Sequence, residues 1–301
     1  MSRLQANLLL LACAAIWGFA FVFQKRAMEH IGPFTFICLR SVLACAALAL
    51  PAWLEWRRAE RPTTARLPRR FMLLSGLAGV AFFGGAGFQQ AGLVTASATN
   101  AGFLTALYVI LTPFLAWLML RQQPGARIWM AAGLAFAGTW LLGGGSLAAF
   151  ARGEVLVTLS ALLWALHVIL VSLAATRGLA VVFTLAQFAV VALLGAVAAV
   201  AFGETIDPDA MRRVLVDIAY VGLLSSALTF TLLTLAMRAT RPAEAAVIMS
   251  TESLFAALGG VCFLGDRLPA IAWLGGAAIF AATLIVHLPQ RRAPAAAISG
   301  P

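Results

Sequence analysis

The chain has 301 residues, of which 62% are hydrophobic and only 11% are charged, whereas a soluble domain is about 45–50% apolar and about 25% charged. The mean hydropathy of +0.97 excludes an ordinary soluble protein and indicates an integral membrane protein. The formal net charge of +10 could suggest a nucleic-acid partner, but the chain has no basic helix and no alternation of aromatic and basic residues. We therefore expect a lipid bilayer as its surroundings and no nucleic acid as its partner.

Ten segments are apolar and long enough to cross a bilayer, which takes about 20 residues. In chain order they are 6–26, 33–54, 70–91, 97–120, 126–145, 153–175, 180–203, 213–237, 242–264 and 269–288. The connections are short apart from the basic stretch 55–70, so no segment is left to form a soluble domain. We expect residues 291–301, rich in Ala, Pro and Gly, to form a disordered cytoplasmic tail.

The arginines and the lysine are distributed unevenly over the two ends of these segments. Fourteen arginines lie on the side of the N-terminus, including Arg57, Arg58, Arg69 and Arg70, and six basic residues lie on the other side. Because cytoplasmic loops carry the excess of Lys and Arg, both termini are predicted to be cytoplasmic. The sequence thus predicts a multi-pass protein of the cytoplasmic (inner) membrane.

Cofactor chemistry has little support in the sequence. The four cysteines lie in apolar runs without CxxC spacing, so neither a zinc site nor a disulfide framework is indicated. No GxxxxGK[ST] loop is present, which argues against direct coupling to ATP. We expect no cofactor and no bound metal.

The two halves of the chain resemble each other weakly. At a spacing of 147 residues, Trp17 matches Trp164 and Arg40 matches Gln187. At a spacing of 145, four further residues match, namely Ala91, Thr95, Ala98 and Pro124 with Ala236, Thr240, Ala243 and Pro269. Each half holds five spans, and five is odd, so the second half must enter the membrane from the opposite side. We predict an all-α fold of ten transmembrane helices in two inverted five-helix repeats, residues 1–147 and 148–290, which is an alternating-access architecture.

Several short motifs resemble those of a known transporter family. They are Trp17-Gly18-Phe19 in the first segment, Leu39-Arg40 in the second with a basic loop after it, Tyr108 to Phe114 with Trp117-Leu118 in the fourth, and Ser253 to Ala257 with Gly265-Asp266 in the second half. Together they resemble the drug/metabolite transporter superfamily in its ten-helix EamA-type branch, over about residues 6–288. Within that branch, the nearest resemblance is to YddG-like exporters of aromatic amino acids. The resemblance implies export of small metabolites through a cavity between the repeats.

Three ionisable side chains within the apolar segments are candidates for substrate binding, because burial of such groups in a membrane costs a few kcal/mol or more. Glu252 could couple transport to protons or bind an ammonium group, or it could be a neutral group that hydrogen-bonds to its neighbours. Arg40 could bind a carboxylate, or it could pair with an acid or extend to the interface. His167 could make transport sensitive to pH, or it could be a packed, hydrogen-bonded core residue.

The aromatic candidates are Trp17, Phe21, Tyr108 and Trp164, which lie in the middle of spans or on polar faces. They could stack planar substrates, although core packing is the simpler explanation for any one of them. Gln187 joins the set as the counterpart of Arg40. Neutral polar residues could line a cavity or hold helices together, and they are Gln24, Gln89, Gln90, Asn100, Thr105, Ser225, Ser226 and Thr229. Polar, Gly and Pro residues concentrate in the third, fourth, eighth and ninth segments, which we expect to bend.

These observations predict a monomeric secondary transporter that exports or exchanges small metabolites. The resemblance makes amino acids the expected substrates, aromatic ones first. The alternative is a lipophilic-cation or drug exporter, or a lipid flippase, of the same superfamily. A cation exporter would need a buried acid, and Glu252 could be that acid. A membrane-embedded enzyme is a remote alternative, because the eleven acids and three histidines are scattered along the chain.

Overall fold

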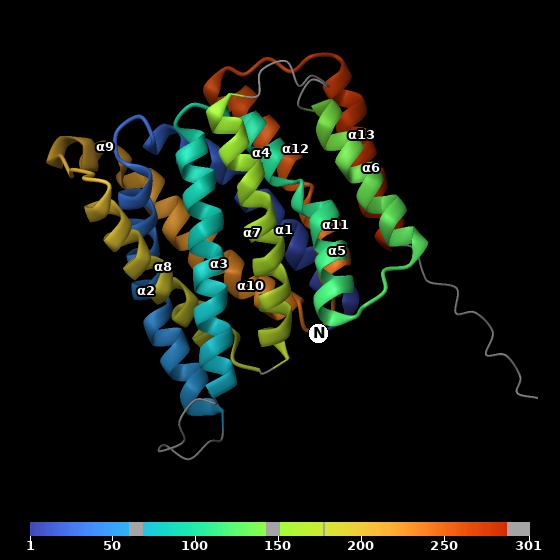
Figure 1. Cartoon of the computed structure of the whole chain (residues 1–301), viewed down its shortest axis with the longest axis horizontal. Coiled ribbons are helices and arrows are strands. Elements are labelled where there is room, and N and C mark those ends of the chain that lie inside the picture. Colours follow the sequence, from blue (N-terminus) through green and yellow to red (C-terminus); the bar gives the residue numbers. More distant parts are fainter. Residues whose placement is uncertain (60–68, 143–150, 177, 288–301) are drawn as a thin grey trace, which may run out of the picture.

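The computed structural model describes residues 1–59, 69–142, 151–176 and 178–287, and the regular structure in them is helical (Figure 1). The first half contains α1 (Arg3–Ala27), α2 (Pro33–Arg58), α3 (Arg69–Leu93), α4 (Ala98–Thr105), α5 (Tyr108–Leu120) and α6 (Ala126–Leu142). The second half contains α7 (Arg152–Ala175), α8 (Ala180–Ala201), α9 (Pro208–Ala219), η1 (Tyr220–Leu228), α10 (Thr229–Ala236), α11 (Pro242–Met249), α12 (Glu252–Gly259), η2 (Gly260–Leu264) and α13 (Ile271–His287). The predicted tail 291–301 and the end of the predicted span 126–145 lie outside the described residues.

These elements form ten membrane spans, as the sequence predicted. Eight are long and apolar enough to cross a membrane, and α6 and α13 are shorter apolar helices. Helices suit this environment because they satisfy their backbone polar groups within the segment, where lipid offers no hydrogen bonds. Large apolar side chains cover the outside of the bundle, for example Val200, which is 82% exposed. The protein is therefore an all-helical membrane protein.

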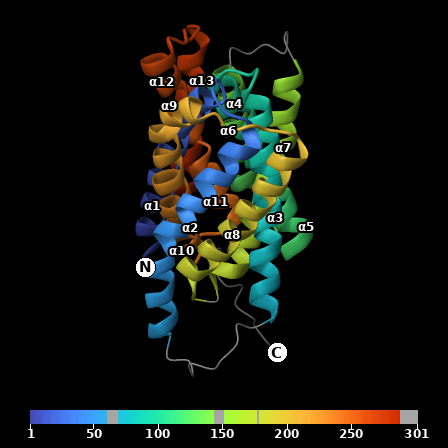
Figure 2. The ribbon, with the colours of Figure 1, turned by 90° about the vertical axis from the view of Figure 1, so that its left-hand side faces the viewer.

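The packing relates the two halves to each other. Helix α2 packs against its counterpart α8, and α6 packs against its counterpart α13. In the same way α1 packs against α12, while α7, the counterpart of α1, packs against α5. Figures 1 and 2 show α2 beside α8 along one side of the bundle, with α3 and α7 next to them. Each half therefore closes its core with helices of the other half, as expected for inverted repeats.

The α2–α8 pair is held at both ends by carboxylates. Glu55, near the end of α2, accepts hydrogen bonds from the backbone N–H groups of Val181 and Val182 at 2.8 and 2.9 Å. Glu204, just after α8, accepts from the N–H groups of Phe34 and Thr35 at 3.1 and 2.6 Å. Each carboxylate thus caps the N-terminus of the other helix, where unpaired donors and the helix dipole favour negative charge. This reciprocal capping fixes the register of α2 against α8.

Three of the four spans that were expected to bend are interrupted. The fourth span breaks between α4 and α5 at Ala106 and Leu107, and the ninth breaks between α11 and α12 at Ser250 and Thr251. The eighth span contains the π-helical segment η1, whereas the third span, α3, is continuous. The two breaks occupy corresponding places in the two halves. Interruptions of this kind at matching positions mark substrate sites in transporters built from inverted repeats.

The break in the ninth span is supported by its own side chains. Ser250 Oγ donates to the carbonyl oxygen of Val247 at 2.7 Å, Thr251 Oγ1 donates to that of Ile248 at 2.8 Å, and Ser253 Oγ donates to that of Ser250 at 2.6 Å. Hydroxyl groups that bond to nearby carbonyls compete with the helical pattern, which explains a break in an apolar span that contains no internal proline. In the fourth span, Pro113 lies inside α5 and the break comes before it.

Candidate functional site

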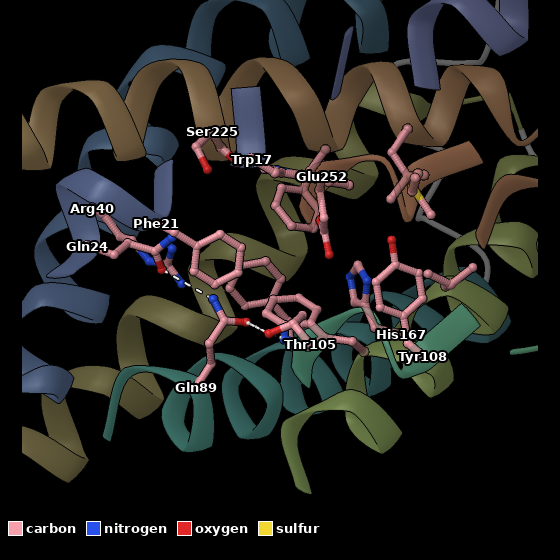
Figure 3. Close-up of a pocket in the computed structure, with 16 residues that line it drawn as sticks. Trp17, Phe21, Gln24, Arg40, Gln89, Thr105, Tyr108, His167, Ser225 and Glu252 are labelled. Carbon is pink, nitrogen blue, oxygen red and sulfur yellow. Dashed lines mark hydrogen bonds between the residues drawn. The ribbon is translucent and has the colours of Figure 1, made fainter. Parts of the chain in front are cut away.

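A cavity lies between the two halves, where the interrupted spans meet. Its volume is about 580 Å³ with the space at its mouth included. Seven of the eight candidate residues line it, namely Trp17, Phe21, Arg40, Tyr108, Trp164, His167 and Glu252. They come from α1, α2, α5, α7 and α12, so both halves contribute walls. Figure 3 shows these side chains converging from helices that are far apart in the sequence.

Helix α1 contributes one wall of the cavity. Trp17, Phe21 and Gln24 are spaced so that they share one helix face, and all three line the cavity. Trp17 Nε1 donates to the carbonyl oxygen of Ser225 at 2.9 Å. Ser225 lies in η1, so the indole N–H ties α1 to the π-helical segment of the other half. π-Helical segments inside membrane spans and other helices are frequent at functional sites.

The matching tryptophan of the second half has a comparable role. Trp164 Nε1 donates to Gln89 Oε1 in α3 at 2.8 Å. Its ring meets Phe82 edge-on, with the ring centroids 5.0 Å apart, and Phe230 lies 5.0 Å from Trp17 and 4.8 Å from Phe82. Trp17, Phe82, Trp164 and Phe230 therefore form one aromatic cluster against the cavity. Such faces can stack planar apolar groups.

His167 is paired with Gln187, the one candidate that does not line the cavity. The His167 Nε2 and Gln187 Oε1 atoms are 2.8 Å apart, and both side chains are buried. His167 also meets Phe82 edge-on at a centroid distance of 5.6 Å. Gln187 thus lies behind His167 and fixes its ring.

Arg40 is buried at the cavity without an acidic partner. Its side chain is only 4% exposed, and no carboxylate of the described residues forms a salt bridge with it. Its Nε atom has no hydrogen-bond partner. The guanidinium lies over the rings of Phe36 and Phe82, at 5.8 and 5.5 Å from their centroids. Of the two structural alternatives for Arg40, pairing with an acid and extension to the interface, the described residues provide neither.

Glu252 and Tyr108 begin the helices that follow the two breaks. Glu252 is the first residue of α12 and Tyr108 is the first residue of α5, and each is 4% exposed. Glu252 Oε1 and Tyr108 Oη have no hydrogen-bond partner in the described residues. Figure 3 shows both groups directed into the cavity beside His167. The helix breaks therefore bring an unpaired carboxyl and an unpaired phenol to the same space.

The neutral polar candidates divide into two groups. Gln24, Gln89, Thr105 and Ser225 line the cavity. Gln89 joins Gln24 to Thr105, because its amide nitrogen lies 3.5 Å from Gln24 Oε1 and its Oε1 lies 3.5 Å from Thr105 Oγ1. The others do not line it, and they are Gln90, Asn100, Ser226 and Thr229. The residues of the first group come from four elements, α1, α3, α4 and η1, and sequence periodicity cannot reveal that they meet.

Sequence reasoning missed five further apolar lining residues, which are Phe82, Val168, Phe230, Leu233 and Met249. Phe82 was predictable in principle, because it lies seven residues before Gln89 and so shares its helix face. Phe230 carries no such signal. It reaches the cavity because η1 changes the helix period just before it, and a π-helical segment is not encoded by a simple pattern.

Trp17→Ala is expected to reduce transport at least about tenfold while leaving most of the folded protein intact. The substitution removes the wall of the cavity and the indole hydrogen bond to Ser225, and the partner left is a carbonyl oxygen that Thr229 Oγ1 still satisfies at 2.7 Å. A tenfold effect corresponds to about 1.4 kcal/mol. Transport by reconstituted protein should be compared with the yield of monodisperse protein. An equal loss of both would mean that Trp17 serves only in packing.

No group of three or more His, Cys, Asp or Glu side chains that could hold a metal ion occurs among the described residues. The site offers instead aromatic faces, one guanidinium, one carboxyl and several amide and hydroxyl groups. That chemistry suits reversible binding of a small molecule.

Comparisons with known proteins agree with this architecture. A solved crystal structure shares the fold, with a TM-score of 0.75 and 18% identity over 94% of this chain and 96% of the other. An uncharacterized transporter of Archaeoglobus fulgidus is 29% identical over 96% of this chain and 87% of its own, and the uncharacterized transporter YwfM of Bacillus subtilis is 26% identical over 95% of each. The model of the EamA-like transporter family matches residues 4–144 and 151–288, once in each half. The chain therefore belongs to the EamA-like transporter family.

Proposed function

We propose that this transporter exports or exchanges small metabolites across the cytoplasmic membrane, that amino acids are its substrates, and that aromatic ones are preferred. The observation that carries the proposal is the composition of the cavity. Two tryptophans from corresponding places in the halves meet Phe230, and Arg40, Tyr108 and Glu252 are unpaired beside them. An aromatic amino acid offers a ring for the first group and charged ends for the second.

The position of this cavity between the halves supports alternating access as the mechanism. If each half rocks as a unit, the cavity opens first to one side of the membrane and then to the other, while the same residues line it. The breaks at Ala106–Leu107 and Ser250–Thr251 let α4 and α11 tilt separately from α5 and α12. We propose residues 1–147 and 148–290 as the two moving repeats. The absence of a phosphate-binding loop in the sequence favours secondary transport.

The proposed orientation has both termini in the cytoplasm. The N-terminus and the end of α2 lie towards the same end of the bundle (Figure 1). Arg3, Arg57, Arg58, Arg69 and Arg70 lie in the first residues of α1 and α3 and the last residues of α2. An excess of basic residues on the cytoplasmic side is the rule for membrane proteins. In this orientation Gln24, near the end of α1, points to the outer mouth of the cavity. We propose a monomer as the working unit.

The proposal is tested by transport in proteoliposomes. The purified protein is reconstituted and supplied with labelled tryptophan, phenylalanine, threonine or a lipophilic cation, with and without a pH gradient. We expect tryptophan and phenylalanine to move faster than threonine, and protein-free liposomes serve as the control. If neither aromatic amino acid moves, the proposed substrates are wrong, although the family assignment stands.

A lipophilic-cation exporter is the second candidate, because one observation favours it. The unpaired carboxyl of Glu252 lies against an aromatic cavity, and a planar cation would be attracted both to a carboxylate and to aromatic faces. Movement of the lipophilic cation without movement of any amino acid in the same assay would select this function. A lipid flippase would instead be indicated if labelled phospholipid crossed the bilayer only in the presence of the protein.

A further inference from the structure

We propose that Arg40, with the amide groups of Gln24 and Gln89, forms an anion-binding subsite that receives the carboxylate of the transported molecule. The inference rests on the proposed function, since it assigns one end of the substrate to one end of the same cavity. It adds a requirement that this function does not contain: a substrate needs a carboxylate, whereas its amino group is dispensable for binding at this subsite.

The first argument is the state of the guanidinium. Arg40 lines the cavity, is 4% exposed and has an Nε without a hydrogen-bond partner. Within the described ranges the salt bridges are Arg3–Glu244, Arg26–Asp217 and Arg212–Asp209, and none includes Arg40. A buried polar atom without a partner requires an explanation, and a bound ion is one such explanation.

The second argument is that Arg40 cannot lower the energetic cost of its burial by becoming neutral. A guanidinium keeps its proton in proteins, whereas an acid such as Glu252 can become neutral by binding one. The rings of Phe36 and Phe82 offer the guanidinium a weak electrostatic attraction, but they supply no hydrogen-bond acceptor. A buried charge is normally paired, so a bound anion supplies what the protein itself does not.

The third argument is the set of neighbouring donors. Gln24 and Gln89 line the cavity with Arg40, and Figure 3 shows Arg40 and Gln24 together at one end, on the far side of Phe21 from Glu252. Gln24 uses its Oε1 to accept from the Gln89 amide at 3.5 Å. Its own amide nitrogen donates to no described residue, so it remains a free donor beside the guanidinium. A carboxylate has two oxygens and accepts from two such donors at once.

The fourth argument comes from the second half. The position that corresponds to Arg40 is Gln187, which is buried and bonds to His167. The packing of α2 against α8 therefore does not need a charge at this place. Among the described residues Arg40 has no acidic partner that explains its charge, and the reciprocal caps at Glu55 and Glu204 already hold the two helices together.

The test uses acid and amine analogues that differ only in the charged group. The purified full-length protein is titrated with L-tryptophan, indole-3-propionate and tryptamine, and with 3-phenylpropionate and phenethylamine, while its thermal unfolding is followed. Ligands that bind the folded state raise the unfolding temperature. We expect the wild type to be stabilised by tryptophan and by at least one of the two acids at concentrations at which the corresponding amine has little effect.

The variants are Arg40→Gln, Arg40→Lys and, as a matched control, Arg212→Gln, which removes an arginine that is 80% exposed and lies outside the cavity. Arg40→Gln introduces the residue that the second half already carries. It should raise the half-saturating concentration of the acids about 10- to 100-fold, the range expected for loss of a charge-assisted hydrogen bond, and leave the response to amines unchanged. Arg40→Lys should restore part of the loss. Arg212→Gln should leave the responses to the acids and to the amines unchanged.

Each contrary outcome is recognisable. The inference is overturned if no acid stabilises the wild type, if the amines act and the acids do not, or if Arg40→Gln leaves the acid response unchanged. A further titration with sodium chloride tests an inorganic occupant: stabilisation by chloride, with competition against the acids, would assign the subsite to an inorganic anion and overturn the proposal. If the wild type transports neither tryptophan nor phenylalanine, the proposed function is rejected. If Arg40→Gln binds the acids as the wild type does, only this subsite is rejected.

Discussion

Gly18→Ala is expected to destabilise the protein by about 1–3 kcal/mol, the usual range for overpacking a tight core, and to lower transport per folded molecule at least about tenfold. A Cβ atom at Gly18 would lie within 2.4 Å of Phe255 Cβ and 2.5 Å of the carbonyl oxygen of Glu252. The second contact is with backbone, which cannot rotate away. Helix α12 would have to move, and Glu252 begins that helix.

The measurement compares thermal unfolding and tryptophan transport of Gly18→Ala with those of Gly76→Ala. Gly76 lies inside α3, and a Cβ there would meet no atom within 4 Å. Alanine is the better helix former by about 1 kcal/mol, so the control should be neutral or slightly stabilised. Equal behaviour of the two variants would show that the contact between α1 and α12 is loose. The middle residue of the Trp17-Gly18-Phe19 motif would then lack the packing role assigned to it.

Glu252→Gln is expected to abolish the response of transport to a pH gradient while the yield of folded protein is maintained. Two groups that can take up a proton line the cavity, Glu252 and His167. His167 is held by Gln187 at 2.8 Å, whereas Glu252 Oε1 has no partner and is free to exchange a proton with a substrate or with water. Glutamine keeps the shape of the side chain and removes only the titration.

The size of this effect follows from the driving force. With one proton exchanged per substrate, a gradient of one pH unit corresponds to about 1.4 kcal/mol, which sustains about a tenfold accumulation. Proteoliposomes with the wild type should reach this ratio for tryptophan, and those with Glu252→Gln should only equilibrate. His167→Gln is the matched control and should still accumulate substrate. Accumulation by Glu252→Gln would mean that Glu252 does not carry the coupling.

Much of the fold could be predicted from the sequence, because a helix that spans a bilayer needs about 20 mostly apolar residues in a row. Ten apolar stretches gave ten spans, and the odd number in each half gave the inverted arrangement. The resemblance to the EamA-type branch, carried by motifs around Trp17 and Tyr108, is confirmed by the family match to both halves. The narrower resemblance to aromatic amino-acid exporters stays a prediction.

The site was predictable where it depended on polar residues in apolar helices. Arg40, His167 and Glu252 stood out because each is costly to bury, and the structure places all three at one cavity. Phe82 and Phe230 did not stand out, because an aromatic residue in a membrane helix faces lipid as readily as a cavity. The sequence indicated which spans bend but not the residues at which they break. The breaks depend on the hydroxyl bonds of Ser250 and Thr251 and on packing between halves, which no local pattern specifies.

The central claim is that this cavity holds the substrate and is reached from each side of the membrane in turn. It is tested most directly with Val168→Cys, since Val168 lines the cavity and is 5% exposed, in a background where the four free cysteines are replaced by serine or alanine. An impermeant thiol reagent is added to one side of the membrane or to the other. We predict that the thiol reacts from both sides and that tryptophan slows both reactions. Labelling from one side only, at a rate that tryptophan does not change, would contradict the account.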